Sequence, residues 1–434
     1  MGAPHPAVPT GRAGDPQAVP AGRRGEQRAR IVLARRDRAA GRGRSPKQGR
    51  YAVSRRLRRS LLPVLAVLAT LALLLAACAH RPLPDARTAL NPRAIVFYYN
   101  WYGSPEIDGE RLHWSHPVLK FNPDDPDRPP IPGDGDIAAD FYPALGEYSS
   151  ADPDTVERHM AMIARAGIGI VAVTWLGEGD PSARSLPLLF EAAARHGLRL
   201  CFQIEPAARP DIGAAREAMV RIVERFGSHP ALFRDPDSGR PLFFVYDSYQ
   251  IPAVDWARVL TADGDLSLRG TRFDADVIGL WVGADEHAFF RDGGFDGFYT
   301  YFASRGFSYG STPAHWSSLQ RWAQDNGMRF IPSVGPGYLD ARVRPWNGAN
   351  AHDRDGGRYY DDMFAAAIAS GATHVAITSF NEWHEGTQIE PAVPHTYPGR
   401  HYLDYAPLPP DHYLRRTRYW LSKHPPGLQP PPSR

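Results

Sequence analysis

The sequence predicts a single (β/α)8 TIM barrel with long active-site loops, and three observations lead to this fold class. From Ala94 onward, short apolar runs typical of buried parallel strands alternate with amphipathic segments typical of helices. Eight such runs occur before the chain ends. An open doubly wound sheet is the alternative, but no glycine-rich dinucleotide fingerprint follows the first run. The expected strands are 94–99, 169–175, 198–205, 242–246, 276–282, 296–301, 329–334 and 374–380.

The amphipathic segments between these runs have recognisable ends. Helices are expected at 154–166, 184–196 and 211–226, because each segment is followed by a glycine, the residue type that most often stops a helix. These glycines are Gly167, Gly197 and Gly227. The barrel is therefore expected to span 94–423, with a Pro-rich tail at 424–434.

Charge divides the chain into two unlike parts. Residues 1–59 carry a net charge of +13, so the remainder carries −10 to give the total of +3. The basic arm has almost no apolar periodicity and is expected not to fold. Nucleic-acid binding by this arm is the weaker reading, because Arg55 to Arg59 suit the positive start of a signal peptide beginning at Val53. We expect no nucleic-acid partner.

Residues 60–78 form an apolar segment that resembles an export signal. The run from Leu61 to Ala77 is short for a spanning helix, which usually needs ~20 apolar residues. It ends in Leu75-Ala-Ala-Cys78, which resembles the lipobox of bacterial lipoproteins, so Cys78 is the expected lipidation site. A simple signal anchor is the second choice. Either way the protein is expected to be exported and membrane-tethered, facing the periplasm or cell exterior, with 79–93 as a linker.

The stretch from Ile377 to Glu390 carries the densest group of reactive side chains. Glu382 and Glu385 follow the last expected strand, beside the side chains of Asn381, Trp383 and His384. Cleavage of a sugar bond needs one carboxylic acid to protonate the leaving oxygen and one carboxylate that stays ionised. A solvated charged loop is the alternative reading, but Trp383 and its apolar neighbours favour a partly buried site.

Other chemistries lack their signatures. His384-Glu385 is followed by Gln388 where a zinc protease would need a second histidine, so no metal site is expected. No Gly-x-Ser-x-Gly elbow and no phosphate-binding loop occur. Carboxylate catalysis on a sugar remains, or the same groove used only to bind carbohydrate.

Polar and aromatic residues end most of the expected strands, where a barrel places its chemistry. Aromatic rings pack on the apolar faces of sugars while neighbouring groups bind hydroxyls. Two long segments, 103–148 and 335–347, are expected to overhang the same mouth. The candidate residues at strand ends are Tyr99, Trp101, Trp175, Glu205, Tyr299 and Tyr301.

A series of motifs in the body resembles glycoside hydrolase family 99, the endo-α-mannosidases and endo-α-mannanases. The resemblance covers roughly residues 94–423 and departs from the family at Leu176, where an aromatic residue is usual. The motifs are Phe97-Tyr-Tyr-Asn-Trp-Tyr-Gly103, His113-Trp-Ser-His-Pro117, Ile204-Glu-Pro206, Asp296-Gly-Phe-Tyr-Thr-Tyr-Phe302, Arg344-Pro-Trp-Asn347 and Thr378-Ser-Phe-Asn-Glu-Trp-His-Glu-Gly-Thr-Gln-Ile-Glu390.

The resemblance implies a retaining enzyme that cleaves internal α-1,2-mannosidic bonds in α-mannan or mannose-rich oligosaccharides. It implies that Glu382 acts as a base on the 2-hydroxyl of the substrate, giving a 1,2-anhydro sugar, and that Glu385 protonates the leaving oxygen and then activates water. No metal or organic cofactor is implied, and we expect a monomer. A non-catalytic carbohydrate-binding lipoprotein that uses the same groove is the alternative.

Overall fold

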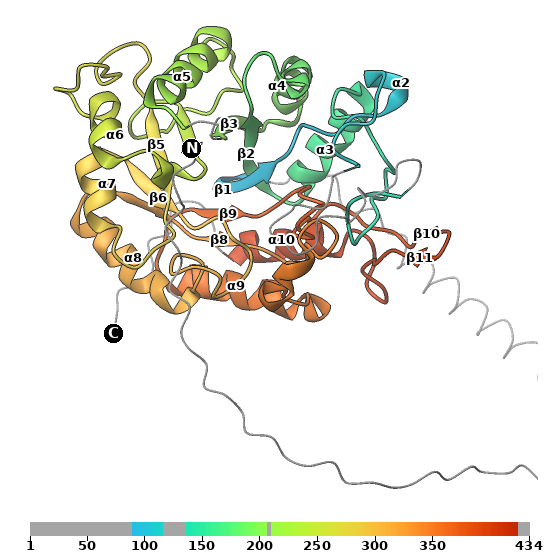
Figure 1. The fold of residues 1–434 in the computed structure, drawn as a ribbon. Coiled ribbons are helices and arrows are strands. Elements are labelled where there is room, and N and C mark those ends of the chain that lie inside the picture. The colour runs from blue at the N-terminus through green and yellow to red at the C-terminus, as the bar shows by residue number, and fades with distance from the viewer. Residues whose placement is uncertain (1–88, 116–135, 206–209, 424–434) are drawn as a thin grey trace, which may run out of the picture. The chain divides into compact units, whose positions relative to one another are not determined.

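A parallel sheet of nine strands lies at the centre of the protein (Figure 1), a computed structural model that describes residues 89–115, 136–205 and 210–423. Neighbouring strands pair in parallel in the order β7-β6-β5-β4-β3-β2-β1-β9-β8. The strands are β1 (Asn91–Tyr98), β2 (Ile168–Trp175), β3 (Arg199–Ile204), β4 (Leu242–Val245), β5 (Asp276–Leu280), β6 (Gly297–Tyr299), β7 (Arg329–Ile331), β8 (Ser333–Val334) and β9 (Val375–Ile377).

The two ends of this sheet belong to one stretch of chain. β7 and β8 are separated only by Pro332, which has no N–H to donate to a neighbouring strand. β7 pairs with β6, and β8 pairs with β9. The sheet therefore closes on itself, which confirms the predicted (β/α)8 barrel. All eight predicted strands are present, and the seventh, expected as one strand at 329–334, is divided at Pro332.

Helices surround the strands (Figure 1), as the alternating pattern predicted. Gly167 and Gly197 follow α3 and α4 with φ of 82° and 73°, whereas Gly227 caps α5 with a right-handed φ of −59°. The helices are α2 (Pro105–Asp108), α3 (Pro153–Arg165), α4 (Leu186–His196), α5 (Ile212–Phe226), α6 (Ala253–Leu260), α7 (His287–Gly293), α8 (Pro313–Asp325), α9 (Arg358–Ala369) and α10 (His412–Lys423), with a small hairpin of β10 (Thr396–Tyr397) and β11 (Arg400–His401).

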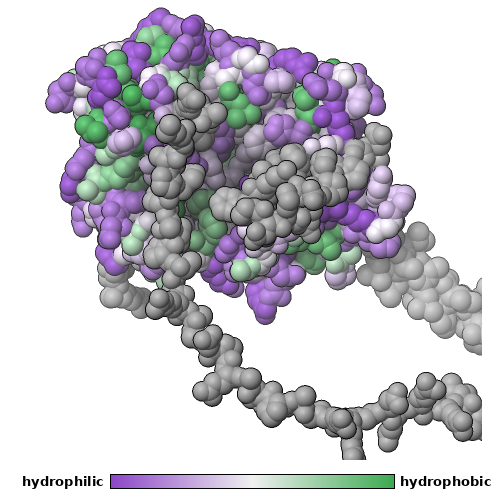
Figure 2. All heavy atoms as spheres, viewed as in Figure 1, coloured by the Kyte–Doolittle hydropathy of each residue, from purple (hydrophilic) through white to green (hydrophobic). Residues whose placement is uncertain are grey.

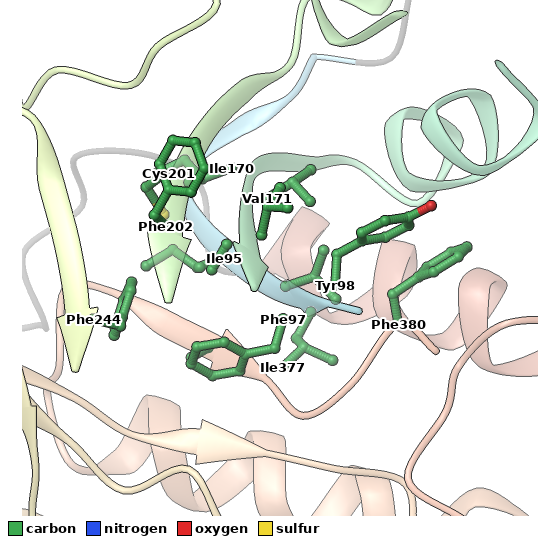
Figure 3. Close-up of a cluster of buried hydrophobic side chains, with 14 of the residues drawn as sticks. Ile95, Phe97, Tyr98, Ile170, Val171, Cys201, Phe202, Phe244, Ile377 and Phe380 are labelled. Atoms are coloured by element: carbon green, nitrogen blue, oxygen red, sulfur yellow. The ribbon is translucent and has the colours of Figure 1, made fainter. Parts of the chain in front are cut away.

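The core has two layers, one inside the barrel and one between barrel and helices (Figure 3). Because side chains alternate along a strand, adjacent residues of β1 serve different layers. Phe97 packs against Phe244 and Tyr299, with ring centroids 5.3 and 5.5 Å away. Tyr98 packs in the outer layer, where its ring lies 5.7 Å from that of Phe380.

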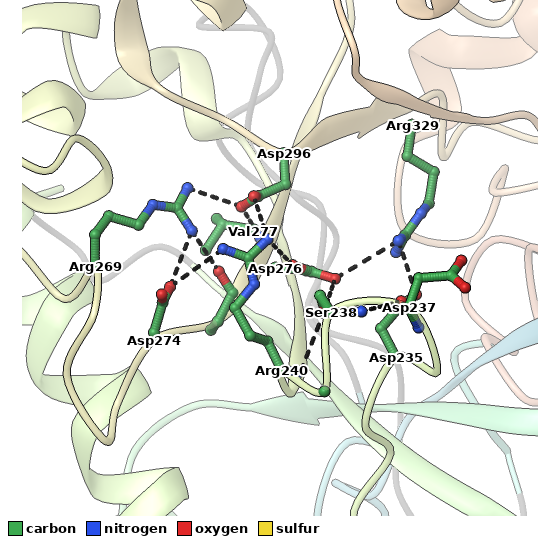
Figure 4. A network of polar contacts seen from close by, with 12 residues as sticks. Asp235, Asp237, Ser238, Arg240, Arg269, Asp274, Asp276, Val277, Asp296 and Arg329 are labelled. Carbon is green, nitrogen blue, oxygen red and sulfur yellow. Dashed lines mark hydrogen bonds and ion pairs between the residues drawn. The ribbon is translucent and has the colours of Figure 1, made fainter.

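Charged side chains form a network at the N-terminal ends of β4 to β7 (Figure 4). Arg240 lies 2.5 Å from Asp276 and 2.9 Å from Asp296, measured between nitrogen and oxygen. Arg329 lies 2.7 Å from Asp235. This end of a barrel supports stability, whereas chemistry is found at the opposite end.

The coloured part of the face seen in Figure 2 is largely hydrophilic, with hydrophobic residues scattered over it. Within 89–115, 136–205 and 210–423, no helix combines the length and apolar character needed to cross a membrane. The predictions for the basic arm, the segment 60–78, Cys78 and the tail 424–434 concern residues outside the described part.

Candidate active site

A cavity of about 230 Å³ opens at the C-terminal ends of the barrel strands. It contains both predicted catalytic carboxylates, which follow β9. His113 and Arg344 come from the two long segments expected to overhang the mouth, so both segments contribute side chains to the lining of the cavity. The lining residues are Tyr99, Trp101, His113, Gln203, Glu205, Tyr246, Tyr301, Val343, Arg344, Glu382, His384 and Glu385.

The loop after β9 folds back on itself and fixes both carboxylates. Ser379 donates its backbone N–H to the carbonyl of Thr387 at 3.0 Å, and its hydroxyl accepts from the N–H of Glu382 at 2.7 Å. Gly386 has φ of 61°, and a Cβ there would lie 2.7 Å from the carbonyl oxygen of Leu339. Only glycine fits this turn, because it alone adopts such a φ without strain and adds no atom.

Glu382 is only 4% exposed. Burial raises its pKa well above the usual value, and the neighbouring Glu385 raises it further. Its Oε1 accepts from the N–H of His384 at 3.1 Å. The ring Nε2 of His384 donates to the carbonyl of His113 at 2.7 Å, which orients the imidazole beside Glu382.

Glu385 lies beside a guanidinium. Burial raises the pKa of Glu385, whereas Arg344, 3.6 Å away, opposes this rise. Arg344 is itself held by Asp340 at 3.2 Å. Arg344 also opposes the rise in the pKa of Glu382, so the same guanidinium limits the shift at both carboxyl groups.

Aromatic rings line the same cavity as these carboxylates. The hydroxyls of Tyr99 and Tyr301 hydrogen-bond to each other. Trp101 lies against Tyr99 and stacks on His113 with centroids 4.7 Å apart and an interplanar angle of 4°. Such flat faces beside hydrogen-bonding groups suit a sugar ring.

Glu205 completes the cavity from the end of β3. It accepts a hydrogen bond from Gln203 at 2.5 Å. Burial raises the pKa of Glu205 to about 7, with Asp247 and Glu385 adding to the rise. This carboxyl group is therefore partly protonated at neutral pH and can both donate to and accept from a hydroxyl.

Four predicted site residues do not line this cavity. Asn381 and Trp383 are fully buried behind the loop, because its backfolding turns their side chains inward. Tyr299 is fully buried in the barrel interior, and its hydroxyl has no hydrogen-bond partner among the described residues. Trp175 lines a neighbouring pocket of about 210 Å³, which shares Glu205 and Tyr246 with the cavity.

Five cavity residues were not among the predicted site residues. Gln203 stands two positions before Glu205 and so faces the same side of β3, a signal that the strand period provides. Tyr246 directly follows β4. His113, Val343 and Arg344 come from long loops, whose paths leave no periodic pattern in the sequence.

Metal chemistry has no obvious site in the described residues, where no cluster of three or more His, Cys, Asp or Glu side chains could hold an ion. The cavity offers two carboxyl groups with raised pKa values, beside aromatic rings. This arrangement can donate a proton to one oxygen while removing a proton from another.

Comparison with known proteins identifies the family. The family model of glycosyl hydrolase family 99 matches residues 89–425. A glycoprotein endo-alpha-1,2-mannosidase from Xenopus laevis is 42% identical over 352 residues, which cover 76% of each chain. A glycoprotein endo-alpha-1,2-mannosidase-like protein from Homo sapiens is 40% identical over 339 residues, covering 75% of this chain and 74% of the other.

A solved structure agrees with these relatives. The GH99 endo-alpha-mannosidase from Bacteroides thetaiotaomicron is 49% identical, superposes with a TM-score of 0.75, and covers 77% of this chain and 98% of its own. The match of the family model includes the barrel and the loop that carries Glu382 and Glu385. The chain therefore belongs to glycosyl hydrolase family 99 and is a glycoside hydrolase.

Proposed function

We propose that this protein is a retaining endo-α-1,2-mannosidase that cleaves internal α-1,2-mannosidic bonds in mannan or high-mannose glycans. The observation that carries the proposal is the buried pair of Glu382 and Glu385, which share one cavity with an aromatic wall in a member of this family. The names of the relatives from Xenopus laevis and Bacteroides thetaiotaomicron support the choice of mannosidic substrate.

The proposed reaction has two displacements. In the first, Glu382 takes the proton of the substrate 2-hydroxyl, whose oxygen attacks C1 as the glycosidic C1–O bond breaks, and Glu385 gives its proton to the leaving oxygen. The product is a 1,2-anhydro sugar. In the second, water loses a proton to Glu385 and attacks C1, the C1–O2 bond breaks, and O2 recovers its proton from Glu382. Two inversions at C1 give net retention.

The scheme begins with a proton on Glu385 and a charge on Glu382. Burial raises the pKa of both carboxyl groups, and Arg344 opposes the rise at both. A substrate 2-hydroxyl that donates to Glu382 would favour the charged form of Glu382, because hydrogen bonding to a carboxylate stabilises its charged form.

The remaining cavity residues are proposed to hold the sugar. Tyr99, Trp101 and Tyr301 offer ring faces and hydroxyls, and Glu205 and His384 offer hydrogen bonds. Trp175 lies in the neighbouring pocket, which continues from the cavity through Glu205 and is suited to the next sugar of the chain. An enzyme that cuts inside a chain needs such a continuation on at least one side.

The protein is further proposed to act outside the cytoplasm as a monomer tethered through a lipid on Cys78. The apolar run ending in Leu75-Ala-Ala-Cys78 supports export with a tether. Metabolic labelling with an alkyne palmitate tests this proposal: label on the wild type and none on Cys78→Ala supports it, and equal label on both contradicts it.

The direct test is incubation with an α-1,2-branched mannan and with a high-mannose oligosaccharide, with products followed by mass spectrometry and their anomeric configuration by NMR. Disaccharide or larger products of retained configuration are expected. Release of single mannose units or inverted products would contradict the proposal. Binding without cleavage would instead favour a carbohydrate-binding role for the same cavity.

A further inference from the structure

The loop that carries the two reacting carboxylates contains a third glutamate, Glu390, which the proposed chemistry does not use. Its side chain is fully buried, and so is that of His159 on α3. Oε1 of Glu390 lies 3.1 Å from Nε2 of His159. Oε2 accepts from the hydroxyl of Tyr148 at 2.9 Å and from the indole N–H of Trp383 at 3.0 Å.

We infer that Glu390 is a positioning residue that holds the loop of Glu382 in place against Tyr99 at the end of the neighbouring strand β1. This inference rests on the proposed function, because it assigns Glu390 to the same reaction. Glu390 does not line the cavity. Its carboxylate accepts a hydrogen bond from Trp383, which follows Glu382, and is linked through Tyr148 to Asn381, which precedes Glu382.

The first path runs through Tyr148 and Asn381 to Tyr99, at the end of the neighbouring strand β1. The hydroxyl of Tyr148 accepts from Nδ2 of Asn381 at 3.2 Å. The amide of Asn381 spans the backbone of Tyr99, accepting from its N–H and donating to its carbonyl, each at 2.8 Å. Asn381 directly precedes Glu382, so one chain of contacts joins Glu390, the base and the tyrosine wall.

The second path runs through Trp383, which directly follows Glu382. Its indole N–H points to Glu390, and its backbone N–H donates to the hydroxyl of Tyr102 at 3.2 Å. Tyr102 also donates to the carbonyl of Asn381 at 3.1 Å. The residues before and after Glu382 are thus fixed on both their backbone and side chains, and Glu390 accepts directly from Trp383 and is linked to Asn381 through Tyr148.

Glu390 is itself held firmly enough to act as a reference point. Its backbone N–H donates to Phe380 at 2.9 Å, and its carbonyl accepts from Tyr405 at 2.8 Å. Nδ1 of His159 lies 2.9 Å from the hydroxyl of Tyr98 on β1, so the pair also connects helix α3 to the barrel. A displacement of ~1 Å at reacting groups can cost ~10²-fold in rate, so small shifts here matter.

The test compares two buried carboxylates at opposite ends of the barrel. Glu390→Gln keeps the shape of the side chain but replaces one carboxylate oxygen, which accepts hydrogen bonds, by an amide NH₂ group, which donates them. Asp276→Asn makes the same kind of change in the network of Figure 4, far from the cavity. For Glu390→Gln we expect kcat to fall about 10- to 100-fold with KM within about twofold. For Asp276→Asn we expect a lower Tm with unchanged kcat.

Several outcomes would overturn the inference. One is a folded Glu390→Gln variant with the kcat of the wild type. Another is that Glu390→Gln and Asp276→Asn lose kcat in the same proportion to their loss of Tm. If Glu390→Gln does not fold, Tyr148→Phe decides, because it breaks the first path while keeping the ring. A fall in its kcat of about fivefold or more is expected, and an unchanged kcat overturns the inference.

A structural measurement separates this inference from the proposed function. If the wild-type protein cleaves no mannoside, the proposed function fails. A crystal structure of Glu390→Gln then still tests positioning, since a shift of Asn381 relative to Tyr99 supports it. Unchanged positions of these two residues would overturn it.

Discussion

Replacing Glu205 by glutamine should stabilise the protein at alkaline pH and leave its stability nearly unchanged at acidic pH. Burial raises the pKa of this carboxyl group from the ordinary 4.5 to about 7. In the unfolded chain this carboxyl group ionises at its ordinary pKa. Between that pKa and about 7, the folded protein therefore binds one more proton than the unfolded chain does. The free energy of unfolding is highest below the unfolded pKa and falls as the pH rises toward 7.

The size of the effect follows from this difference in pKa. One pKa unit corresponds to about 1.4 kcal/mol, so keeping an ionised Glu205 in the fold costs about 3 kcal/mol at pH 8. At pH 5 most of this cost is absent, and under about 1 kcal/mol remains. Glutamine carries no charge at either pH, and its side-chain oxygen can still accept from Gln203.

Urea denaturation of wild type and Glu205→Gln at pH 5 and pH 8 measures this difference. We expect the variant to be more stable by about 3 kcal/mol at pH 8 and by under about 1 kcal/mol at pH 5. Glu178→Gln is the matched control, because Glu178 is exposed and should behave like wild type at both values. Equal stabilisation at both pH values, or none at pH 8, would refute the reasoning.

Three further predictions concern the catalytic pair and the opposite end of the barrel. Glu385→Gln and Glu382→Gln should each lower kcat by about 10²–10⁴-fold while leaving sugar binding largely intact. Near-normal turnover by either variant, measured per active site, would exclude the role assigned to that residue. The wild-type enzyme should also fail to cleave a substrate that lacks its 2-hydroxyl. Arg344→Gln should raise the pKa of Glu385 and move the alkaline limb of the kcat/KM profile to higher pH, because the acid keeps its proton longer; an unmoved limb would argue against Glu385 as the acid. Arg329→Gln should lower the free energy of unfolding by about 3 kcal/mol, because it leaves Asp235 buried without this partner. The kcat per folded molecule should stay unchanged. A large fall in kcat would contradict the view that this end of the barrel serves stability and the opposite end serves catalysis.

Much of the fold could be predicted because buried parallel strands leave continuous apolar runs in the sequence. The strand from Ile168 to Trp175 is buried along its whole length, and its pattern was plain. The division of the seventh strand at Pro332 was missed, although proline cannot donate to a neighbouring strand. A strand interrupted by one residue keeps its apolar run and looks continuous.

The candidate site was predictable where chemistry follows a strand directly, as at Glu382, Glu385 and Glu205. The orientation of loop side chains was not predictable. Asn381 and Trp383 face inward because residues 379 and 387 pair across the loop, a contact that composition and period do not encode. Arg344 joins the cavity from another loop, and only the fold brings it within reach of Glu385.

Closure of the barrel by its last strand has a consequence for how the enzyme is made. β9 fills the gap between β1 and β8, with Ala94 of β1 in register with Val375. The same strand leads into the loop that carries both carboxylates. A chain emerging from its N-terminus therefore has open sheet edges and no active site until its C-terminal segment arrives. A product that stops before Val375 therefore lacks the closing strand and both carboxylates, and we expect it to be inactive toward glycans.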